Sequence, residues 1–558
     1  MTQNKQIENE NSQPVVTKLC VFNWLDYLIF IPLSMINLCA IVYFSIHWFS
    51  LPDWREHPIL FWIVTVLLAY QLSVYQFRWF LLPLMKKPNP KLIEKDWKVG
   101  VATTFVPGAE SFEMLERTVS ALVALKYPHD TWVLDEGDDN RVKALCAKLG
   151  AYHFSRKNLH QYQTEDGVYK ARTKYGNYNA WLSEIGFRKY EIFTSFDPDH
   201  VPDLSFLENV IGYFSDPSVA YVQAAQAYYN QDASFIARGA AEETYAYYSS
   251  TQMSIYSMDF PIVVGCHNTH RMSSLEQVGG FAPHDGDDLL ITLLYRNAGW
   301  QGVYLPMILA KGLTPVDWSG YLTQQLRWVQ SVLDIKIRAF PKMAGNLPFK
   351  TRLMGLLHGL YYVQEGLSNF VALSLMAFML ATGITPKFLS YLTMKKVIVL
   401  IAVLQFLDFY RQRFFLDWRR EWGFHWRARL LRLAKWPYIF IGFVYALTNR
   451  KRPYALTLKV KTEAKRYMLI CPHLLIAITL TVAWLAGMLF GHVLHPLLQA
   501  WTALIVMLSI GFIWTETWDF PEPYDEKLWV EMSSIKEKRN KKIHYFTPHK
   551  TGNLNIRQ

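Results

Sequence analysis

Long runs without charged side chains flank a polar block in this chain, and they restrict its fold more than any other feature. Residues 27–48 and 59–77 contain no Asp, Glu, Lys or Arg. Each run is long enough to cross a bilayer as a helix, which takes about 20 mostly apolar residues. After the block, further apolar runs follow at 366–384, 397–410, 467–490 and 497–514. The sequence therefore predicts two membrane helices before the polar block and four after it.

The distribution of basic residues predicts which side of the membrane the polar block occupies. An even number of crossings before and after the block puts the block and both termini on one side. Between Arg411 and Arg466 there are 15 Lys or Arg residues against three Asp or Glu, and basic residues near membrane helices favour the cytoplasm. We expect a protein of the inner (plasma) membrane with a cytoplasmic block, and an interfacial segment at 411–449 that contacts lipid headgroups. The net charge of +11 then belongs to the bilayer surface, and no nucleic-acid partner is expected.

The polar block alternates β-rich runs with helical ones. Strand-like runs occupy 99–106, 131–136, 151–155 and 190–199. Strand–helix alternation of this kind predicts an α/β domain with a mostly parallel sheet. The expected divisions are a cytoplasmic tail at 1–22, two transmembrane helices at 23–85, the α/β domain at 86–335, a membrane domain with interfacial helices at 336–520 and a basic tail at 521–558.

Acidic residues stand at the ends of two predicted strands. Asp135 closes the first, and Asp197 and Asp199 close the second, with His200 next. Ligands of α/β sheets bind at the carboxyl ends of the strands, and two carboxylates there can hold a hard divalent cation that clamps a diphosphate. A solvated turn would also explain a D-x-D sequence taken alone.

Two further groups of polar residues follow. Asp287 and Asp288 stand at the start of a predicted helix, where acids also serve as ordinary N-terminal caps. Gln324, Arg327 and Trp328 belong to the run Q-Q-L-R-W near the expected membrane boundary. An interfacial amphipathic helix would account for that last group equally well.

The order and spacing of all four groups resemble the D, D-x-D, D, Q-x-x-R-W layout of processive family-2 glycosyltransferases, in particular the catalytic subunit of cellulose synthase. Smaller similarities fall between the large ones, at 174–179, 222–226, 265–271, 279–281 and 454–459. The resemblance implies a GT-A domain inserted in a multi-span membrane domain. It implies an enzyme that polymerises a UDP-sugar, with UDP-glucose as the first expectation, into a β-linked polysaccharide and exports it.

The resemblance also assigns roles to residues. The nucleoside and diphosphate of the donor would meet Glu110, Asp135, Lys174, Asp197, Gln324 and Arg327. Mg²⁺ or Mn²⁺ would be held by Asp197, Asp199 and His200. Asp288 would be the general base, with Asp287 as the next candidate. The nascent polysaccharide would meet Trp328, Cys266 and His267, and Thr457 and Lys459 would belong to a gating loop at 450–462. For that loop, a basic linker held by lipid headgroups is the alternative.

Departures from the family pattern keep other products open. The sequence Gly286-Asp287-Asp288 looks more like hyaluronan and chitin-type synthases, and Cys266 stands where the family carries serine. A capsular or exopolysaccharide synthase with a different UDP-sugar is therefore an alternative, and a periplasmic accessory subunit is a further expected partner. A transporter with a regulatory cytoplasmic domain is the remote alternative, because no internal repeat of the kind common in transporters is evident.

The five cysteines follow no pattern of their own. They show no C-x-x-C spacing and no paired framework, so spacing indicates neither a zinc site nor a disulfide scaffold. We expect five reduced and mostly buried thiols.

Overall fold

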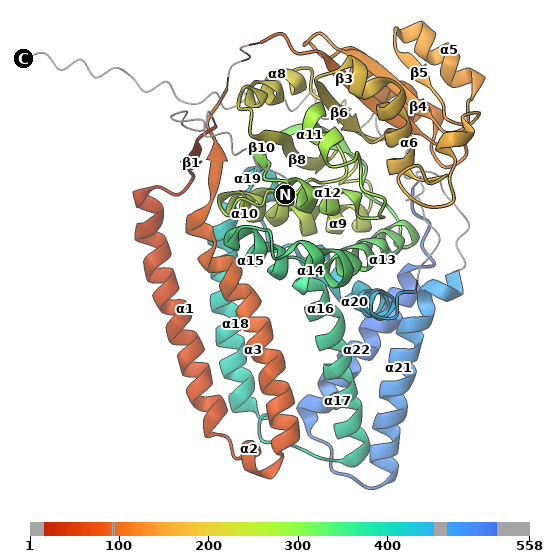
Figure 1. Cartoon of the computed structure of the whole chain (residues 1–558). Helices are drawn as coiled ribbons and strands as arrows, with labels where there is room; N and C mark the ends of the chain where they lie inside the picture. Colours follow the sequence, from red (N-terminus) through yellow and green to blue (C-terminus); the bar gives the residue numbers. More distant parts are fainter. Residues whose placement is uncertain (1–15, 92, 94, 451–465, 522–558) are drawn as a thin grey trace, which may run out of the picture.

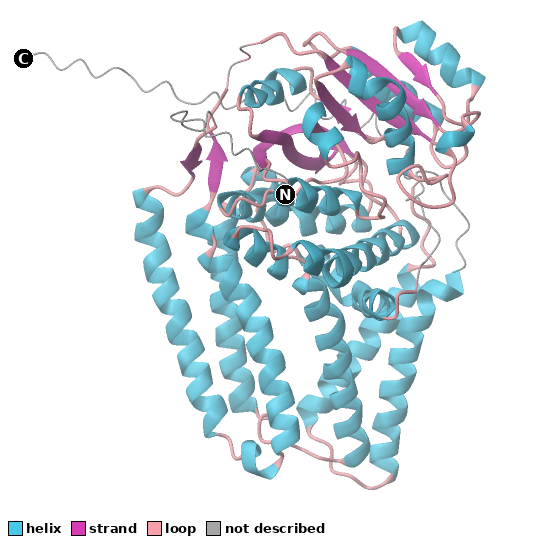
Figure 2. Cartoon of the chain, in the orientation of Figure 1, coloured by secondary structure: helices cyan, strands magenta, loops and turns pink. Residues whose placement is uncertain are grey.

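The computed structural model describes residues 16–91, 93, 95–450 and 466–521. An α/β layer lies at one end of the molecule, long helices lie at the other, and shorter helices separate the two (Figures 1 and 2). The predicted fold class, an α/β domain inserted in a helical membrane domain, is confirmed.

Eight strands of the α/β layer form one sheet in the order β5-β4-β3-β6-β9-β8-β10-β7. The four strands from β5 to β6 are mutually parallel, and β8 runs parallel to β10. Strand β9 runs antiparallel to both β6 and β8, and β7 runs antiparallel to β10. The bounds are β3 Val99–Phe105, β4 Asp130–Asp135, β5 Tyr152–Phe154, β6 Ile192–Phe196, β7 Val201–Pro202, β8 Val219–Tyr228, β9 Asn268–Arg271 and β10 Gln301–Gly312. The four strands predicted from the sequence are β3, β4, β5 and β6.

Both faces of the sheet are buried. Val101 and Ile192 pack in the core on one face, whereas their chain neighbours Ala102 and Phe193 pack in the core on the other. Successive side chains of a strand point to opposite faces, so apolar residues at adjacent positions are what a sheet covered by helices on both sides requires.

Helices of the α/β domain begin at side-chain caps. Ser111 accepts a hydrogen bond from the backbone N–H of Met114 at the start of α4, and Thr173 does the same for Gly176 at the start of α6. Figure 1 places α9, α12 and α13 between the sheet and the long helices. The bounds are α4 Phe112–Val123, α5 Asn140–Leu149, α6 Lys174–Trp181, α9 Phe235–Ala246, α12 Asp287–Asn297 and α13 Trp318–Asp334.

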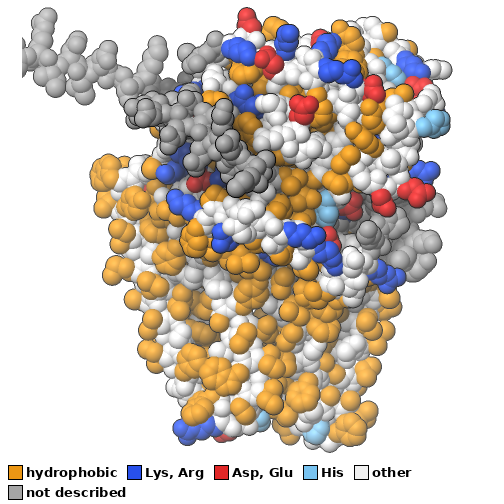
Figure 3. Space-filling view, in the orientation of Figure 1, with side chains coloured by type: hydrophobic (Ala, Val, Ile, Leu, Met, Phe, Trp, Pro, Cys, Tyr) orange, Lys and Arg blue, Asp and Glu red, His pale blue; other side chains and the backbone are white. Residues whose placement is uncertain are grey.

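Six helices of the described residues are long and apolar enough to cross a membrane. They are Trp24–Ser50, Pro58–Leu84, Phe349–Thr382, Trp426–Leu447, Leu469–Leu489 and Pro496–Thr515. On the face shown in Figure 3, hydrophobic side chains cover the long helices, while charged side chains gather over the α/β layer. A surface of this kind suits a bilayer around the long helices, since exposed apolar area of that extent is rare on soluble proteins.

For two helices, the assignment as a membrane span from composition differs from the one that their position in the fold suggests. Composition selects α20 (Trp426–Leu447), which we predicted to be interfacial, and omits α18 (Tyr391–Gln412), which contains the predicted span 397–410. In Figure 1, α18 runs alongside α1 (Trp24–Ser50), whereas α20 lies crosswise near α13. The first half of α20 also carries Arg427, Arg429, Arg432 and Lys435, and such residues favour the interface over the hydrocarbon core.

Chain segments on either side of the first two membrane helices meet. Strand β1 (Lys18–Cys20), within the predicted tail, pairs antiparallel with β2 (Lys86–Pro88). The Lys18 ammonium also contacts Asp259 of the α/β domain. The chain around residue 18 is thus attached to the domain.

All five cysteines lie among the described residues, and none forms a disulfide. Cys146 and Cys266 are buried, whereas Cys20, Cys39 and Cys471 are exposed. The expectation of mostly buried thiols is wrong. Cys39 and Cys471 lie on α1 and α21 (Arg466–Leu489), where an exposed thiol can face lipid.

Candidate active site

The D-x-D carboxylates lie directly after β6. One ligand atom each from Asp197, Asp199 and His200 lie within 4.8 Å of one another. The buried Asp199 accepts a hydrogen bond at Oδ2 from the backbone N–H of Leu313, at 3.1 Å. The His200 ring lies against Gly312, where an added Cβ would meet it at 2.3 Å, so β10 approaches the imidazole closely because it ends in glycine.

This donor set fits a hard divalent cation. Two carboxylates and an imidazole are ligands that Mg²⁺ or Mn²⁺ accepts, and the carboxylates leave room for waters or substrate oxygens. The buried Asp199 is fixed by the sheet, while the Asp197 side chain is 31% exposed and accessible to a ligand.

Lys174 connects the two halves of the site. Its ammonium, at the first residue of α6, contacts Asp197 Oδ1 and the backbone carbonyl of Gly265. Burial disfavours the charged ammonium, but the neighbouring carboxylates, Asp197 first, outweigh it and raise the pKa of Lys174 well above its ordinary value. A fixed positive charge therefore lies beside the D-x-D group.

The backbone of Gly265 bridges from Lys174 to the second acidic pair. While its carbonyl accepts from Lys174, its N–H donates to Asp288 Oδ2 at 3.1 Å. Asp288 Oδ1 accepts from the N–H of Leu289 at 2.7 Å, and Asp287 Oδ1 accepts from the N–H of Asp288 at 3.0 Å. As predicted, both aspartates begin a helix, α12, and the Asp288 carboxylate also contacts the backbone of Gly265.

Burial raises the pKa of both acids. Burial is the larger cause for Asp287, the Asp288 charge is the next, and together they raise the pKa of Asp287 to about 7. Burial likewise raises the pKa of Asp288 against the backbone N–H donors and the charges of Lys174 and Arg327. Adjacent carboxylates of this kind titrate as a pair, and a carboxylate with a raised pKa is suited to accept a proton.

Helix α13 brings the Q-Q-L-R-W residues to the same region. Arg327 is close enough for its charge to favour the ionised form of Asp288. Gln324 and Trp328 are half-buried on this helix. The neighbouring Gln325 is buried and accepts a hydrogen bond from Lys435 of α20 at 3.1 Å, so α20 holds α13 in place.

Comparisons with known proteins agree with this geometry. A model of the family described as "Glycosyltransferase like family 2" matches residues 101–331. This part of the chain is a family-2 glycosyltransferase domain. The family resemblance inferred from the motifs is confirmed for this domain.

The similar proteins are distant and mostly longer. Cellulose synthase 2 of Novacetimonas hansenii is 28% identical over 299 residues, which are 51% of this chain and 18% of that protein. The UDP-forming cellulose synthase catalytic subunit of Xanthomonas axonopodis pv. citri is 26% identical over 304 residues, 52% of this chain and 39% of that subunit. The match thus spans well under half the length of these relatives. Among solved structures, a mannosyltransferase of Pyrobaculum calidifontis in complex with GDP-Man and Mn²⁺ is 15% identical, with a TM-score of 0.46 over 70% of this chain and 98% of that one.

The two remaining predicted donor-binding acids, Asp135 and Glu110, accept hydrogen bonds from backbone N–H groups close to them in the chain. Asp135 is fully buried at the end of β4, where its carboxylate accepts hydrogen bonds from the N–H groups of Gly137 at 2.8 Å and Asp139 at 2.5 Å. Glu110 Oε2 accepts from the N–H of Val106 at 2.8 Å. Each residue orders a loop after a strand, and a role toward the nucleoside stays a prediction.

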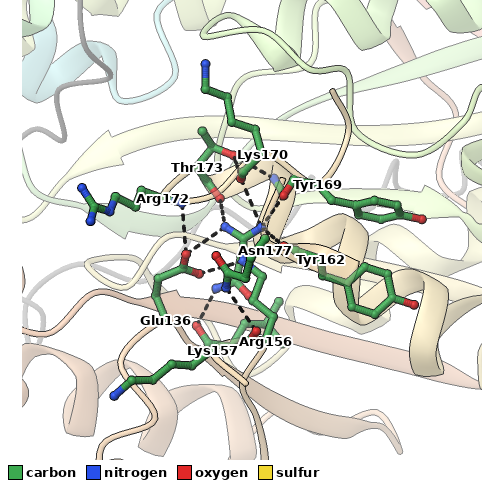
Figure 4. A network of polar contacts seen from close by, with 12 residues as sticks. Glu136, Arg156, Lys157, Tyr162, Tyr169, Lys170, Arg172, Thr173 and Asn177 are labelled. Carbon is green, nitrogen blue, oxygen red and sulfur yellow. Dashed lines mark hydrogen bonds and ion pairs between the residues drawn. The ribbon is translucent and has the colours of Figure 1, made fainter. Parts of the chain in front are cut away.

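A buried arginine organises the loop that precedes Lys174 (Figure 4). The fully buried Arg156 pairs with Glu136 at 2.8 Å and donates to four backbone carbonyls, those of Tyr162, Tyr169, Lys170 and Thr173. Sequence reasoning missed Arg156. The available signal was a charged residue among the aromatic residues of 152–169, which is weak because such a residue is usually exposed.

The predicted acceptor residues and gating residues have different outcomes. Cys266 and His267 follow Gly265 directly and are buried, at 3% and 0% exposure. Their role toward an acceptor is untested. Thr457 and Lys459 of the predicted gating loop lie outside the described residues.

Proposed function

We propose that this protein is a processive, inverting glycosyltransferase that transfers the sugar of a UDP-sugar, UDP-glucose first, to the non-reducing end of a β-linked glycan. The observation that carries the proposal is the Gly265 bridge. The carbonyl and the N–H of one residue join the cation of Lys174, on the D-x-D side, to the carboxylate of Asp288. Donor activation and acceptor deprotonation therefore have a common anchor.

Asp288 is the general base in this mechanism. Its two oxygens are oriented by backbone N–H groups of Gly265 and Leu289, so the carboxylate is held without a flexible partner. It takes the proton of the acceptor hydroxyl as that oxygen attacks the anomeric carbon from the face opposite the diphosphate. One base and a stabilised leaving group are sufficient for inversion in a single displacement.

The donor side holds the diphosphate by charge. A divalent cation bound by Asp197, Asp199 and His200 would supply positive charge to the diphosphate as it leaves. Lys174 and Arg327 bring further positive charge to that region, and Gln324 lies one turn before Arg327 on α13. Trp328, half-buried on the same helix, gives the acceptor sugar an apolar face for stacking.

The membrane helices serve export. The α/β domain stands on α9, α12 and α13, which border the long helices (Figure 1), so a growing chain can enter the bilayer region beside the site of its synthesis. The catalytic domain would face the cytoplasm of the inner membrane, with a periplasmic accessory subunit as an external partner.

The test is sugar transfer by the purified protein in detergent. UDP-glucose, UDP-N-acetylglucosamine, UDP-galactose and UDP-glucuronate are supplied separately with Mg²⁺ or Mn²⁺, and any polymer is digested with linkage-specific glycanases. We expect a β-glucan from UDP-glucose that requires the cation, and none from the Asp288→Asn protein. If no donor yields a glycan with the unaltered protein, the proposal is wrong.

A hyaluronan- or chitin-type product is the second candidate. The Gly286-Asp287-Asp288 sequence favours it, and Gly286 packs tightly, since an added Cβ would lie 3.1 Å from Ser331 and Ile335 side-chain carbons. Polymer made from UDP-N-acetylglucosamine or UDP-glucuronate, with none from UDP-glucose, would select this candidate.

A further inference from the structure

A second group of metal-binding side chains lies beside the D-x-D site. One ligand atom each from His200, Cys266 and His267 lie within 4.8 Å of one another, and all three side chains are buried. The group shares His200 with the D-x-D cluster but replaces carboxylates with a thiol and a second imidazole. We propose that it is a separate site for a thiophilic divalent cation of the Zn²⁺ class.

Hydrogen bonds give His267 the tautomer of a metal ligand. Its Nε2 lies 3.2 Å from the backbone carbonyl of Ala224, so Nε2 carries the proton and donates. The other ring nitrogen, Nδ1, then holds a lone pair. That Nδ1 atom is buried and has no hydrogen-bond partner, an unusual cost for a fully buried polar atom.

The same reasoning applies to His200. Its Nδ1 lies 3.2 Å from Asp199 Oδ1 and donates to it, while its Nε2 lies 3.3 Å from the amide nitrogen of Gln226, which donates to the ring. The lone pair is therefore on Nε2. Zinc-bound histidines characteristically donate their other N–H to a carboxylate or a backbone carbonyl. Both imidazoles already have that outer partner, Asp199 for one and Ala224 for the other.

Backbone conformation adds an independent observation. His267 has a φ of 38°, in the left-handed region that residues with a side chain rarely occupy. Strain of this kind persists where the surroundings hold it, and it concentrates at functional sites. Here it turns an imidazole inward next to a thiol.

The two clusters have different ligand types and therefore favour different cations. Carboxylates suit Mg²⁺ and Mn²⁺, whereas a thiolate with imidazoles selects Zn²⁺ and similar cations. Three protein ligands leave a fourth position for water, as in open zinc sites. Binding forms one metal–sulfur and two metal–nitrogen bonds, displaces the Gln226 amide from His200 and releases the Cys266 thiol proton to solvent.

The two sites are linked through the Asp199–His200 hydrogen bond. A metal on Nε2 takes the one lone pair of His200 away from the D-x-D group and makes the Nδ1–H group more acidic, which withdraws negative charge from Asp199. The same metal also repels a dication held by Asp197 and Asp199. Bound Zn²⁺ should therefore weaken the affinity of the D-x-D group for Mg²⁺ or Mn²⁺. This linkage rests on the proposed function, whereas the site itself does not.

Co²⁺ titration of the purified full chain in detergent, without sugar nucleotide, tests the site. We expect visible d–d bands and a thiolate-to-cobalt charge-transfer band that saturates at one equivalent and is reversed by Zn²⁺. Cys266→Ser should lose the charge-transfer band, while Cys146→Ser, which alters the other buried cysteine, should keep it. Absence of the band in the unaltered protein overturns the site, as does its survival in Cys266→Ser, and the first result needs no variant to fold.

The linkage has its own measurement. The Mn²⁺ concentration for half-maximal sugar transfer should rise several-fold when Zn²⁺ saturates the unaltered protein, and it should rise less in Cys266→Ser. An unchanged Mn²⁺ requirement in the presence of the cobalt band would overturn the linkage. If no sugar transfer occurs at all, the proposed function fails, while the spectra still decide the site.

Discussion

The two carboxylate pairs of the glycosyltransferase domain have opposite surroundings. Asp197 contacts the Lys174 ammonium, and Asp199 contacts the imidazole of His200. The hydrogen bonds of Asp287 and Asp288 come instead from backbone N–H groups, and burial raises the pKa of both. The same residue type thus meets basic side chains in one pair and backbone N–H groups in the other.

This difference indicates how one site can bind a metal and a diphosphate with one carboxylate pair and accept a proton with the other. Carboxylates beside basic side chains suit a metal and a diphosphate, whereas carboxylates with a raised pKa suit proton acceptance. The backbone of Gly265 touches both environments, so the division of roles occurs across a single residue. Variants in either pair should therefore fail in different ways.

The largest effect is expected from Asp288→Asn. The amide preserves the volume but cannot accept a proton, and loss of a general base typically costs about 10²–10⁴ in rate. Polymer formation from a radiolabelled UDP-sugar should fall by that factor, while UDP affinity measured by calorimetry stays within a few-fold.

Asp285→Asn is the matched control, since Asp285 belongs to the same loop but is exposed. It should retain normal turnover. If the Asp288→Asn protein keeps more than a tenth of the rate, Asp288 is not the base, and Asp287 is the next residue to test.

The other pair should fail by losing its ligand. Asp199→Asn removes charge from the cluster, and the remaining acid cannot hold the cation or the diphosphate as well. Both the Mn²⁺ and the UDP-sugar requirements should rise by at least the roughly 10–100-fold that loss of an outer-shell partner costs a metal site. Asp203→Asn, on the exposed loop nearby, should change neither requirement. Full activity of the unaltered protein in excess chelator would contradict the metal assignment.

Sequence reasoning could predict the parts of the molecule that depend on local pattern. Apolar length predicts the membrane helices, and strand–helix alternation predicts β3 to β6 because burial on both faces requires continuous apolar runs. The D-x-D and Asp287–Asp288 pairs are recognisable because each ends or begins an element. The exception is α20, whose apolar second half makes it resemble a span although Arg427 and Lys435 of its first half pair with Glu242 and Glu243 of α9.

Contacts between residues distant in sequence could not be predicted in this way. Arg156 is buried because four carbonyls of a later loop converge on it, and no spacing encodes that convergence. Cysteine spacing indicated no zinc site, yet the antiparallel β9 follows a loop that brings Cys266 to His200, 66 positions earlier in the chain. Tertiary pairing of this kind is visible only once the sheet order is known.

Substitution of Lys174 should change the surroundings of both carboxylate pairs. Its positive charge lowers the pKa of both Asp287 and Asp288, so Lys174→Gln should raise the pKa of both acids further. The acid limb of the kcat–pH profile at saturating donor should move to higher pH, because the base is lost to protonation sooner. Lys170→Gln, which alters an exposed pairing with Asp166, should leave that limb unchanged. A limb at the same pH in both variants would show that Lys174 acts on the donor side alone.

The smallest expected effect is a gain in stability from Asp287→Asn. The folded-state pKa of Asp287 is about 7, above its ordinary value of about 4, so the folded state binds this proton more tightly than the unfolded state. Its stabilising contribution is present at low pH and is lost as the pH rises through 7, where the buried carboxyl must ionise. The neutral amide avoids that loss. The melting temperature of the variant in detergent should therefore exceed that of the unaltered protein by an amount that grows from about pH 4 to about pH 7 and is constant above.

Asp285→Asn is the control, and its difference in melting temperature from the unaltered protein should not depend on pH. An offset for Asp287→Asn that is equal at every pH would mean that the substitution changes packing and that the raised pKa has no part in stability.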